Sequence, residues 1–163
     1  MSNIKNLAIH QKTELPSNIE AEQTLIGSIL ENNEMFDEIS DIVTTDHFYD
    51  DINKKIYSVI SNLISKGLLA NPITLKNFFN KEEQLQEIGG SEYLVKLTKV
   101  STTKTQIKFY VNLLSDLLIR RKLIDISKET FHESTDKNID KDANKILEDT
   151  EKKLFDIAEN GNF

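Results

Sequence analysis

The sequence predicts an all-α fold in which a compact multi-helix head is followed by an antiparallel helical hairpin. Apolar residues recur at intervals of three and four along most of the 163 residues, which is the period of amphipathic helices. Alternation with a period of two, which is typical of half-buried strands, is missing from the sequence. The helical pattern from 103 to 131 spans ~40 Å at about 1.5 Å per residue, so this helix is longer than a small head.

The composition is typical of a globular protein with one core, because 38% of the residues are hydrophobic and 29% are charged. Cysteine is absent and no signal peptide is visible, so we expect a cytoplasmic protein. No apolar run approaches the ~20 residues that a membrane span needs, so we expect no membrane contact.

The charge balance disfavours binding to nucleic acid. The 20 basic and 27 acidic side chains give a net charge of −7, which repels a phosphate backbone, so we expect only weak, salt-sensitive binding. The basic run at residues 119–122 is interleaved with Asp116 and Asp125. We interpret this run as a solvated helix face rather than a phosphate-binding strip.

Residues 1–14 show no sustained period and are predicted to form a flexible N-terminal arm. The first helix is expected to begin at Ser17, because Ser17 and Glu20 have the S-x-x-E spacing of a capping box. Glu20 and Glu22 also suit the positive end of the helix dipole. The apolar residues of this helix recur at threes and fours and are expected to face the core: Ile19, Leu25, Ile26, Ile29 and Leu30.

The predicted head covers residues 15–102 and contains four further helices. A short helix is expected around residues 35–42, and a longer one from Ile52 to Lys66 stops at Gly67, which suits a left-handed conformation. Thr74 is expected to cap the next helix, and Ser91, which follows two glycines, is expected to cap the last one.

The predicted hairpin covers residues 103–160. Its long helix ends near Phe131, and a polar loop follows in which Asp140 is the candidate cap of the last helix. Apolar residues between Ala143 and Ala158 mark that last helix, so the two helices are expected to pair in opposite directions. Residues 161–163 are interpreted as the start of a linker.

The long helix of the hairpin carries more apolar residues than one contact can bury. At ~100° per residue these side chains fall on two sides of the helix, and a single neighbouring helix covers only one of them. We interpret the surplus as a self-association surface, with packing against the head as the alternative. The residues assigned to self-association are Ile107, Tyr110, Val111, Leu114, Leu117, Leu118, Ile119, Leu123 and Ile124.

Motifs for nucleotide or metal chemistry are missing. The sequence contains neither G-x-x-x-x-G-K-[ST] nor G-x-G-x-x-G, and its three histidines lie far apart. Asp46, His47, Asp50 and Asp51 form the one candidate cluster for a divalent ion, but a capped loop with solvated carboxylates explains them better. No catalytic, cofactor-binding or metal-binding residue is assigned.

Five strings occur in order along the chain: LPSNIEAEQTLIGSIL, DHFYDDINKKIY, ITLKNFF, LQEIGGSEYLVKL and FYVNLLSDLLIRRKLI. Together they resemble the N-terminal domain of bacterial replicative DNA helicases of the DnaB family, and the resemblance covers about residues 15–160. Each string is a modest signal, whereas five in register are specific. Asn53, Asn71 and part of LIGSIL depart from residues that the family often has, which leaves the details of partner contacts open.

The resemblance implies an all-helical head with a protruding hairpin, and the hairpins pair subunits into dimers that form a three-fold collar over a hexameric motor. It implies a fragment without catalysis or cofactor, because ATP and magnesium act in a RecA-type motor domain that follows the collar. The implied partners are further copies of the chain, the helicase-binding domain of primase and, in some members, a loader. The candidate docking residues are Glu20, Tyr93 and Ile124.

We therefore predict a non-catalytic collar domain that assembles helicase subunits and docks primase during DNA replication. One alternative is an unrelated helical adaptor that self-associates through its hairpin. Another is a small metal-dependent hydrolase that uses the cluster between Asp46 and Asp51. A RecA-like domain downstream would support the collar and neither alternative.

Overall fold

In the computed structural model, which describes residues 14–79, 83, 86, 90–138 and 140–161, every element is a helix. The predicted all-α class is therefore confirmed for the described residues. Most of the predicted arm and linker, residues 1–13 and 162–163, lies outside them. In chain order the elements are α2 (Ile19–Glu31), α3 (Glu34–Ile39), the 3-10 helix η1 (Thr45–His47), α4 (Asp51–Ser65), α5 (Pro72–Phe79), α7 (Ser91–Thr98), α8 (Ile107–Thr135) and α9 (Ala143–Asn160).

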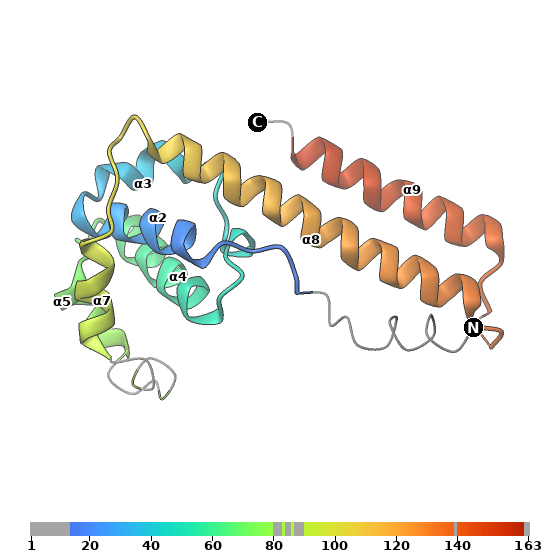
Figure 1. Ribbon diagram of the computed structural model, residues 1–163, viewed down its shortest axis with the longest axis horizontal. Helices are drawn as coiled ribbons and strands as arrows, with labels where there is room; N and C mark the ends of the chain where they lie inside the picture. Colours follow the sequence, from blue (N-terminus) through green and yellow to red (C-terminus); the bar gives the residue numbers. More distant parts are fainter. Residues whose placement is uncertain (1–13, 80–82, 84–85, 87–89, 139, 162–163) are drawn as a thin grey trace, which may run out of the picture.

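The hairpin extends from the head as predicted. Figure 1 shows α8 leaving the head and α9 returning beside it in the opposite direction, and α8 and α9 are in contact. The first turns of α8 belong to the head, because Ile107, Val111 and Leu114 are buried in the same apolar cluster as α2 and α4. The head and the hairpin therefore share one continuous helix.

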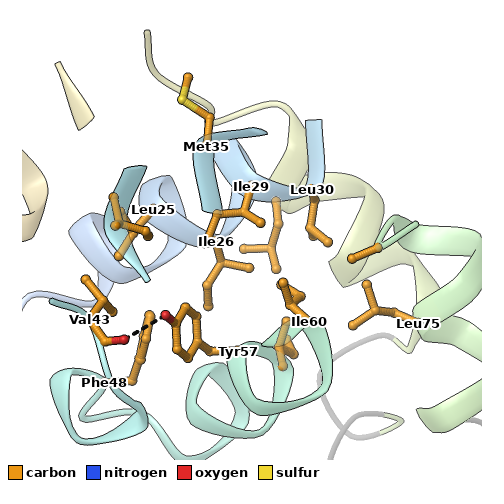
Figure 2. Close-up of a cluster of buried hydrophobic side chains, with 14 of the residues drawn as sticks. Leu25, Ile26, Ile29, Leu30, Met35, Val43, Phe48, Tyr57, Ile60 and Leu75 are labelled. Carbon is orange, nitrogen blue, oxygen red and sulfur yellow. Dashed lines mark hydrogen bonds between the residues drawn. The ribbon is translucent and has the colours of Figure 1, made fainter. Parts of the chain in front are cut away.

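The head core is built around α2. Leu25, Ile26 and Ile29 of this helix are fully buried, as the predicted stripe requires. The prediction is wrong for Ile19, which is exposed because it lies in the first turn of the helix, at the edge of the core. Figure 2 shows these side chains above Tyr57 of α4, whose hydroxyl donates a 2.8 Å hydrogen bond to the carbonyl oxygen of Val43. Each buried Leu or Ile side chain contributes ~1.5–3 kcal/mol, so this stripe accounts for much of the stability of the head.

The helices α2 and α7 cross at Gly27. A Cβ atom at this position would lie 2.0 Å from the carbonyl oxygen of Leu97, so no larger residue fits without separating the two helices. This close approach positions α7 and, with it, Tyr93 against the first half of α2.

The start of α2 differs from the prediction. Asn18 is the N-cap, and its side-chain oxygen accepts a 2.9 Å hydrogen bond from the backbone N–H of Ala21. The predicted capping box of Ser17 and Glu20 is therefore wrong. The physical reason is that an asparagine side chain caps as well as a serine, and Asn18 lies at the residue where the chain turns into the helix.

Two other predicted caps are also replaced by a neighbouring polar residue. Asn71, not Thr74, accepts two 2.9 Å hydrogen bonds from backbone N–H groups in the first turn of α5. Asp142, not Asp140, caps α9 by accepting a 2.8 Å bond from a first-turn N–H. In both cases several cap-forming residues lie close together, and the apolar period does not decide between them.

Glycines define two of the helix boundaries. Gly67 has a φ of 73° directly after α4, which confirms the predicted left-handed stop. Gly90 has a φ of 59° and takes the cap position of α7. Ser91 is therefore the first helical residue and not the predicted cap.

Candidate functional site

Polar contacts join the two helices of the hairpin in the half next to their connecting loop. The hydroxyl groups of Thr130 and Thr150 lie 3.3 Å apart between α8 and α9. Lys153 of α9 forms a 2.7 Å ion pair with Glu129 of α8. Lys141, in the connecting loop, pairs with a carboxylate on each helix, Glu133 at 3.1 Å and Asp149 at 3.2 Å. This polar contact leaves apolar side chains of both helices facing outward.

We call these outward side chains the hairpin stripe, and define it as Leu123 and Phe131 of α8 with Leu147 and Leu154 of α9. Their exposed fractions range from 41% for Leu123 to 72% for Phe131. Leu147 and Leu154 are seven residues apart and so lie on one face of α9. No residue of α9 is buried, although the helix is strongly amphipathic in sequence. The hairpin thus exposes an apolar surface that its own chain does not cover.

Three residues assigned to self-association lie elsewhere. Ile107, Val111 and Leu114 are buried in the head core of the same chain, so they are not available to a partner. This corrects the prediction for these three positions. The reason is that the apolar period shows which side of a helix is buried but does not show what covers it. Packing on the head, the alternative considered from sequence, holds for this part of α8.

The remaining assigned residues divide between three surroundings. Tyr110 and Leu117 are partly buried against the head core. Leu118 and Ile119 line a crevice of about 320 Å³ between the loop before η1, α8 and the end of α9. Leu123 is exposed and belongs to the hairpin stripe, and Ile124 is half-buried. Sequence reasoning missed the stripe on α9, although the spacing of Leu147 and Leu154 was a usable signal.

Arg121 connects α8 to two parts of the head. One terminal nitrogen of its guanidinium donates to the carbonyl oxygen of Pro16 at 2.8 Å, and the other donates to the carbonyl oxygen of Asp46 at 3.1 Å. The guanidinium carbon lies 5.7 Å from the centre of the Tyr49 ring. The interpretation of this basic run as a solvated face is therefore wrong for Arg121, which is buried, although Arg120 is exposed and pairs with Asp116 at 2.7 Å.

The candidate metal cluster is occupied by structural contacts. The Nδ1 atom of buried His47 accepts the backbone N–H of Thr44 at 3.0 Å, so Nε2 carries the proton and donates to the hydroxyl of Ser115 at 3.1 Å. Burial, together with the charge of Lys122, lowers the pKa of His47 to about 4. Asp50 caps α4 through two 3.0 Å bonds. Within the described part of the chain, no group of three or more His, Asp or Glu residues is placed to hold a metal ion.

The environment of Glu22 differs from the one expected from the sequence, in which its carboxylate is solvated and balances the helix dipole. It is buried, and one of its carboxylate oxygens accepts the backbone N–H groups of Tyr49 at 2.9 Å and Asp50 at 3.2 Å. Burial raises the pKa of Glu22 to about 7, although these two hydrogen bonds and nearby Arg121 oppose the shift. Glu22 therefore links α2 to the turn before α4.

The candidate docking residues lie on three helices, Glu20 on α2, Tyr93 on α7 and Ile124 on α8, and α2 contacts both of the other helices. Glu20 is exposed one turn before Gln23, whose side chain donates to the hydroxyl of Tyr93 at 3.2 Å. The Tyr93 hydroxyl in turn donates to Asn53 at 2.8 Å, so only the ring of Tyr93 is open to a partner. On the other side of Pro16, Ile124 lies one turn beyond Arg121 on α8.

Comparisons with known proteins agree with this architecture. The family model of the N-terminal domain of DnaB-like helicases matches residues 14–116. The replicative DNA helicase DnaB of Rickettsia felis is 37% identical over 164 residues, which cover 97% of this chain and 33% of that protein. The corresponding helicase of Rickettsia conorii is 39% identical over 147 residues, which cover 90% of this chain and 30% of that protein.

Two solved structures share the fold. The crystal structure of the N-terminal domain of DnaB helicase from Mycobacterium tuberculosis has a TM-score of 0.78 at 19% identity, covering 88% of this chain and 99% of that one. A DnaB-like replicative helicase, whose structure was described together with its interactions with primase, has a TM-score of 0.67 at 25% identity. That match covers 86% of this chain and 31% of the helicase.

The chain belongs to the DnaB family of replicative helicases, and the part of the family that it matches is the N-terminal domain rather than the motor. It spans about a third of the length of the curated relatives (33% and 30%). Because the chain belongs to this family, the two alternatives considered from sequence, the unrelated adaptor and the small hydrolase, are rejected. Among the described residues, no helix is long and apolar enough to cross a membrane.

Proposed function

We propose that this chain forms the collar of a replicative helicase, where it pairs subunits through its hairpin and docks primase during DNA replication. The observation that carries the proposal is the hairpin stripe. A specific interface removes ~800 Å² per partner from water and has an apolar centre. The stripe, whose four side chains are all exposed, offers such a centre.

The ion pairs of the hairpin suit the same role. They lie between α8 and α9 and hold the two helices in one register without using the apolar side chains of the stripe. The two helices that carry the stripe are therefore already paired before a second copy binds. A preorganised surface loses less conformational freedom on association, which favours binding.

Charges placed in the stripe test the proposal. We expect Leu123→Asp and Leu154→Asp each to convert the dimer, or a larger even-numbered assembly, into a monomer, because a carboxylate is costly to bury in an apolar interface. Sedimentation velocity over a range up to tens of micromolar measures the change, and far-ultraviolet circular dichroism verifies that the variants stay helical.

The chain also offers matched controls for this experiment. Phe109 is exposed on α8 near the head and outside the stripe, so Phe109→Asp should leave the assembly unchanged. Leu117 packs partly against the head core, so Leu117→Asp should destabilise the head instead of producing a folded monomer. The proposal fails if the unmodified chain is already monomeric at tens of micromolar, or if both stripe variants unfold.

Docking of primase is proposed on the candidate residues Glu20, Tyr93 and Ile124. It is supported by the contacts of α2 with α7 and α8, the helices that carry these residues, and by the structural likeness to a helicase that was described with its interactions with primase. A loader is proposed as a further partner on the family resemblance alone.

Catalysis and contact with DNA are assigned to the rest of a longer helicase. ATP and magnesium would act in a motor domain, because this sequence has no phosphate-binding loop. The net charge of −7 supports a role in assembly rather than in binding phosphates.

A further inference from the structure

The crevice between the head and the end of α9 has the features of a binding site for a small molecule. Figure 1 shows α9 returning alongside α8 toward the head. The crevice, of about 320 Å³, lies between the last turn of α9, the middle of α8 and the segment from the end of α3 to η1. Pockets of about 300–1,000 Å³ that combine apolar walls with a few polar groups are typical of ligand sites. The residues around this crevice provide both.

One wall of the crevice is apolar. It is formed by four half-buried side chains from α8, α9 and the turn after α3: Leu118, Ile119, Ile157 and Ile42. Gly161, directly after α9, lies against the same wall, because a Cβ atom placed there would be 3.4 Å from the Cδ1 atom of Ile119. This wall can therefore remove an aliphatic or aromatic side chain of a ligand from water.

A buried hydroxyl group in the crevice has a proton without an acceptor. Ser115 is 7% exposed, and its oxygen accepts a hydrogen bond from Nε2 of His47 at 3.1 Å. Among the described residues, this hydroxyl donates to no acceptor of its own. A buried donor without an acceptor costs free energy. The site therefore favours a ligand that brings an acceptor oxygen to Ser115.

A cation lies on the same side of the helix as this hydroxyl. Lys122 is seven residues beyond Ser115 on α8 and also lines the crevice, and its charge contributes to the low pKa of His47. In the part of the chain that the structure describes, the Lys122 ammonium forms neither an ion pair nor a hydrogen bond. An ammonium and a hydroxyl donor together suit a carboxylate.

Two carboxylates at the mouth of the crevice make a simple anion a poor ligand. Asp41 and Asp46 line the crevice and are exposed, and neither forms an ion pair with any described residue. Because these two charges outnumber the one ammonium of Lys122, a ligand with only negative charge is disfavoured. A zwitterion matches both signs, since its ammonium suits the aspartates and its carboxylate suits the lysine.

We propose that the crevice binds a free amino acid with a large apolar side chain, such as leucine or phenylalanine. The carboxylate of the ligand accepts from the Ser115 hydroxyl and lies against the ammonium of Lys122. Its own ammonium faces Asp41 and Asp46, and its side chain packs on the apolar wall. A bound amino acid contacts the head and both helices of the hairpin at once, so it holds the end of α9 against the head. This role is separate from the proposed assembly function and does not depend on it.

Calorimetric titration of the whole 163-residue chain with L-leucine and with L-phenylalanine tests the proposal. We expect both to bind at millimolar concentration or below, as suits ligands of this size. Three analogues each remove one group: N-acetyl-L-leucine lacks the ammonium, leucinamide lacks the carboxylate, and L-alanine lacks the large side chain. Each should bind about tenfold more weakly than L-leucine. Leucinamide also has the chemistry of a peptide N-terminus, so binding as tight as that of L-leucine would assign the crevice to a peptide end and overturn the proposal.

Variants of the protein locate the site. Lys122→Met and Asp46→Asn should each weaken binding of L-leucine by about tenfold, because each removes one charge that the zwitterion requires. The matched controls are Lys128→Met and Asp37→Asn, which make the same changes of charge at exposed residues outside the crevice and should leave binding unchanged. Circular dichroism verifies that all four variants stay folded. The proposal is overturned if neither amino acid binds at millimolar concentration, or if the folded crevice variants bind L-leucine like the unmodified chain.

Discussion

At the scale of single residues, Glu22 is the side chain whose surroundings differ most from its place in the sequence. A carboxylate in the first turn of a helix normally faces water and balances the helix dipole. Glu22 instead points into the head and accepts two backbone N–H groups from the turn before α4. Removal from water raises its pKa from 4.5 to about 7, so near neutral pH the carboxyl is partly protonated.

This pKa makes the stability of the head depend on pH. The folded chain keeps the proton of Glu22 up to about pH 7, whereas the unfolded chain loses it near 4.5, so the stabilisation is complete below 4.5 and is lost as pH rises through 7. We expect the neutral variant Glu22→Gln to raise the free energy of unfolding at pH 8 by on the order of 2 kcal/mol, with little effect at pH 4.5. Urea unfolding followed by circular dichroism at both pH values measures this.

Glu20→Gln is the control for that measurement, because Glu20 lies on the same helix and is exposed. Removing its charge should change the free energy of unfolding by a similar small amount at both pH values. The assignment of the pH dependence to Glu22 is wrong if Glu22→Gln has equal effects at pH 4.5 and pH 8.

The sequence could not have shown the burial of Glu22 or of His47. Both are polar residues in polar strings, and their partners, Asp50 for Glu22 and Ser115 for His47, are 28 and 68 positions away along the chain. The helical periodicity of apolar residues predicts which of them are buried. It does not show which polar side chains form hydrogen bonds in the protein interior. The apolar stripe of α2 was predictable for the same reason, since burial of Leu25 and Ile29 follows directly from their spacing.

At the scale of elements, Arg121 determines how α8 meets the head. Its guanidinium binds carbonyl oxygens from the segment before α2 and from η1, so one side chain of the hairpin helix holds two irregular segments of the head. Among the residues that the structure describes, no backbone N–H outside the helices donates to either of these oxygens. The planar fork of arginine can reach both at once, which a lysine cannot do.

We expect Arg121→Ala to lower the free energy of unfolding by about 1–3 kcal/mol, because buried carbonyl oxygens lose their donors. Arg121→Lys should recover less than half of the loss. The neighbouring Arg120 is the matched control: it is exposed and makes one ion pair with Asp116, so Arg120→Ala should change stability by less than about 0.5 kcal/mol. Equal effects at the two arginines in urea unfolding would contradict the role given to Arg121.

The helices themselves were largely predictable from the sequence, and their caps were not. Long periodic segments such as α8 follow from apolar spacing, which many residues report together. A cap depends on one side chain, and at the start of α2 and of α5 two suitable residues compete within three positions. The sequence also could not show which apolar residues of α8 pack against the head. Val111 and Leu123 are both apolar, but only Val111 is buried in the head core.

At the scale of the whole molecule, the apolar surfaces lie at both ends of an elongated chain. The hairpin stripe is on α8 and α9, and exposed apolar side chains of α5 and α7, among them Ile73, Phe78 and Val95, are at the far end of the head (Figure 1). Between them, Arg121 of α8 joins the hairpin to the segment before α2, and the candidate docking residues Glu20, Tyr93 and Ile124 lie on three helices, α2, α7 and α8. The proposed hairpin contact leaves Glu20 and Tyr93, which are on the head, free for another protein.

Binding of primase tests the proposed docking residues. We expect Tyr93→Ala and Ile124→Glu each to weaken binding of the helicase-binding domain of primase by about tenfold, because each removes apolar contact area from the proposed surface. Tyr93→Phe separates docking from folding: it removes the hydroxyl that bonds Gln23 and Asn53 but keeps the ring, so binding should stay close to that of the unmodified chain. Calorimetric titration measures these affinities, with Glu159→Lys at the exposed end of α9 as the control. If Tyr93→Ala and Ile124→Glu both stay folded and bind like the unmodified chain, docking on this surface is contradicted.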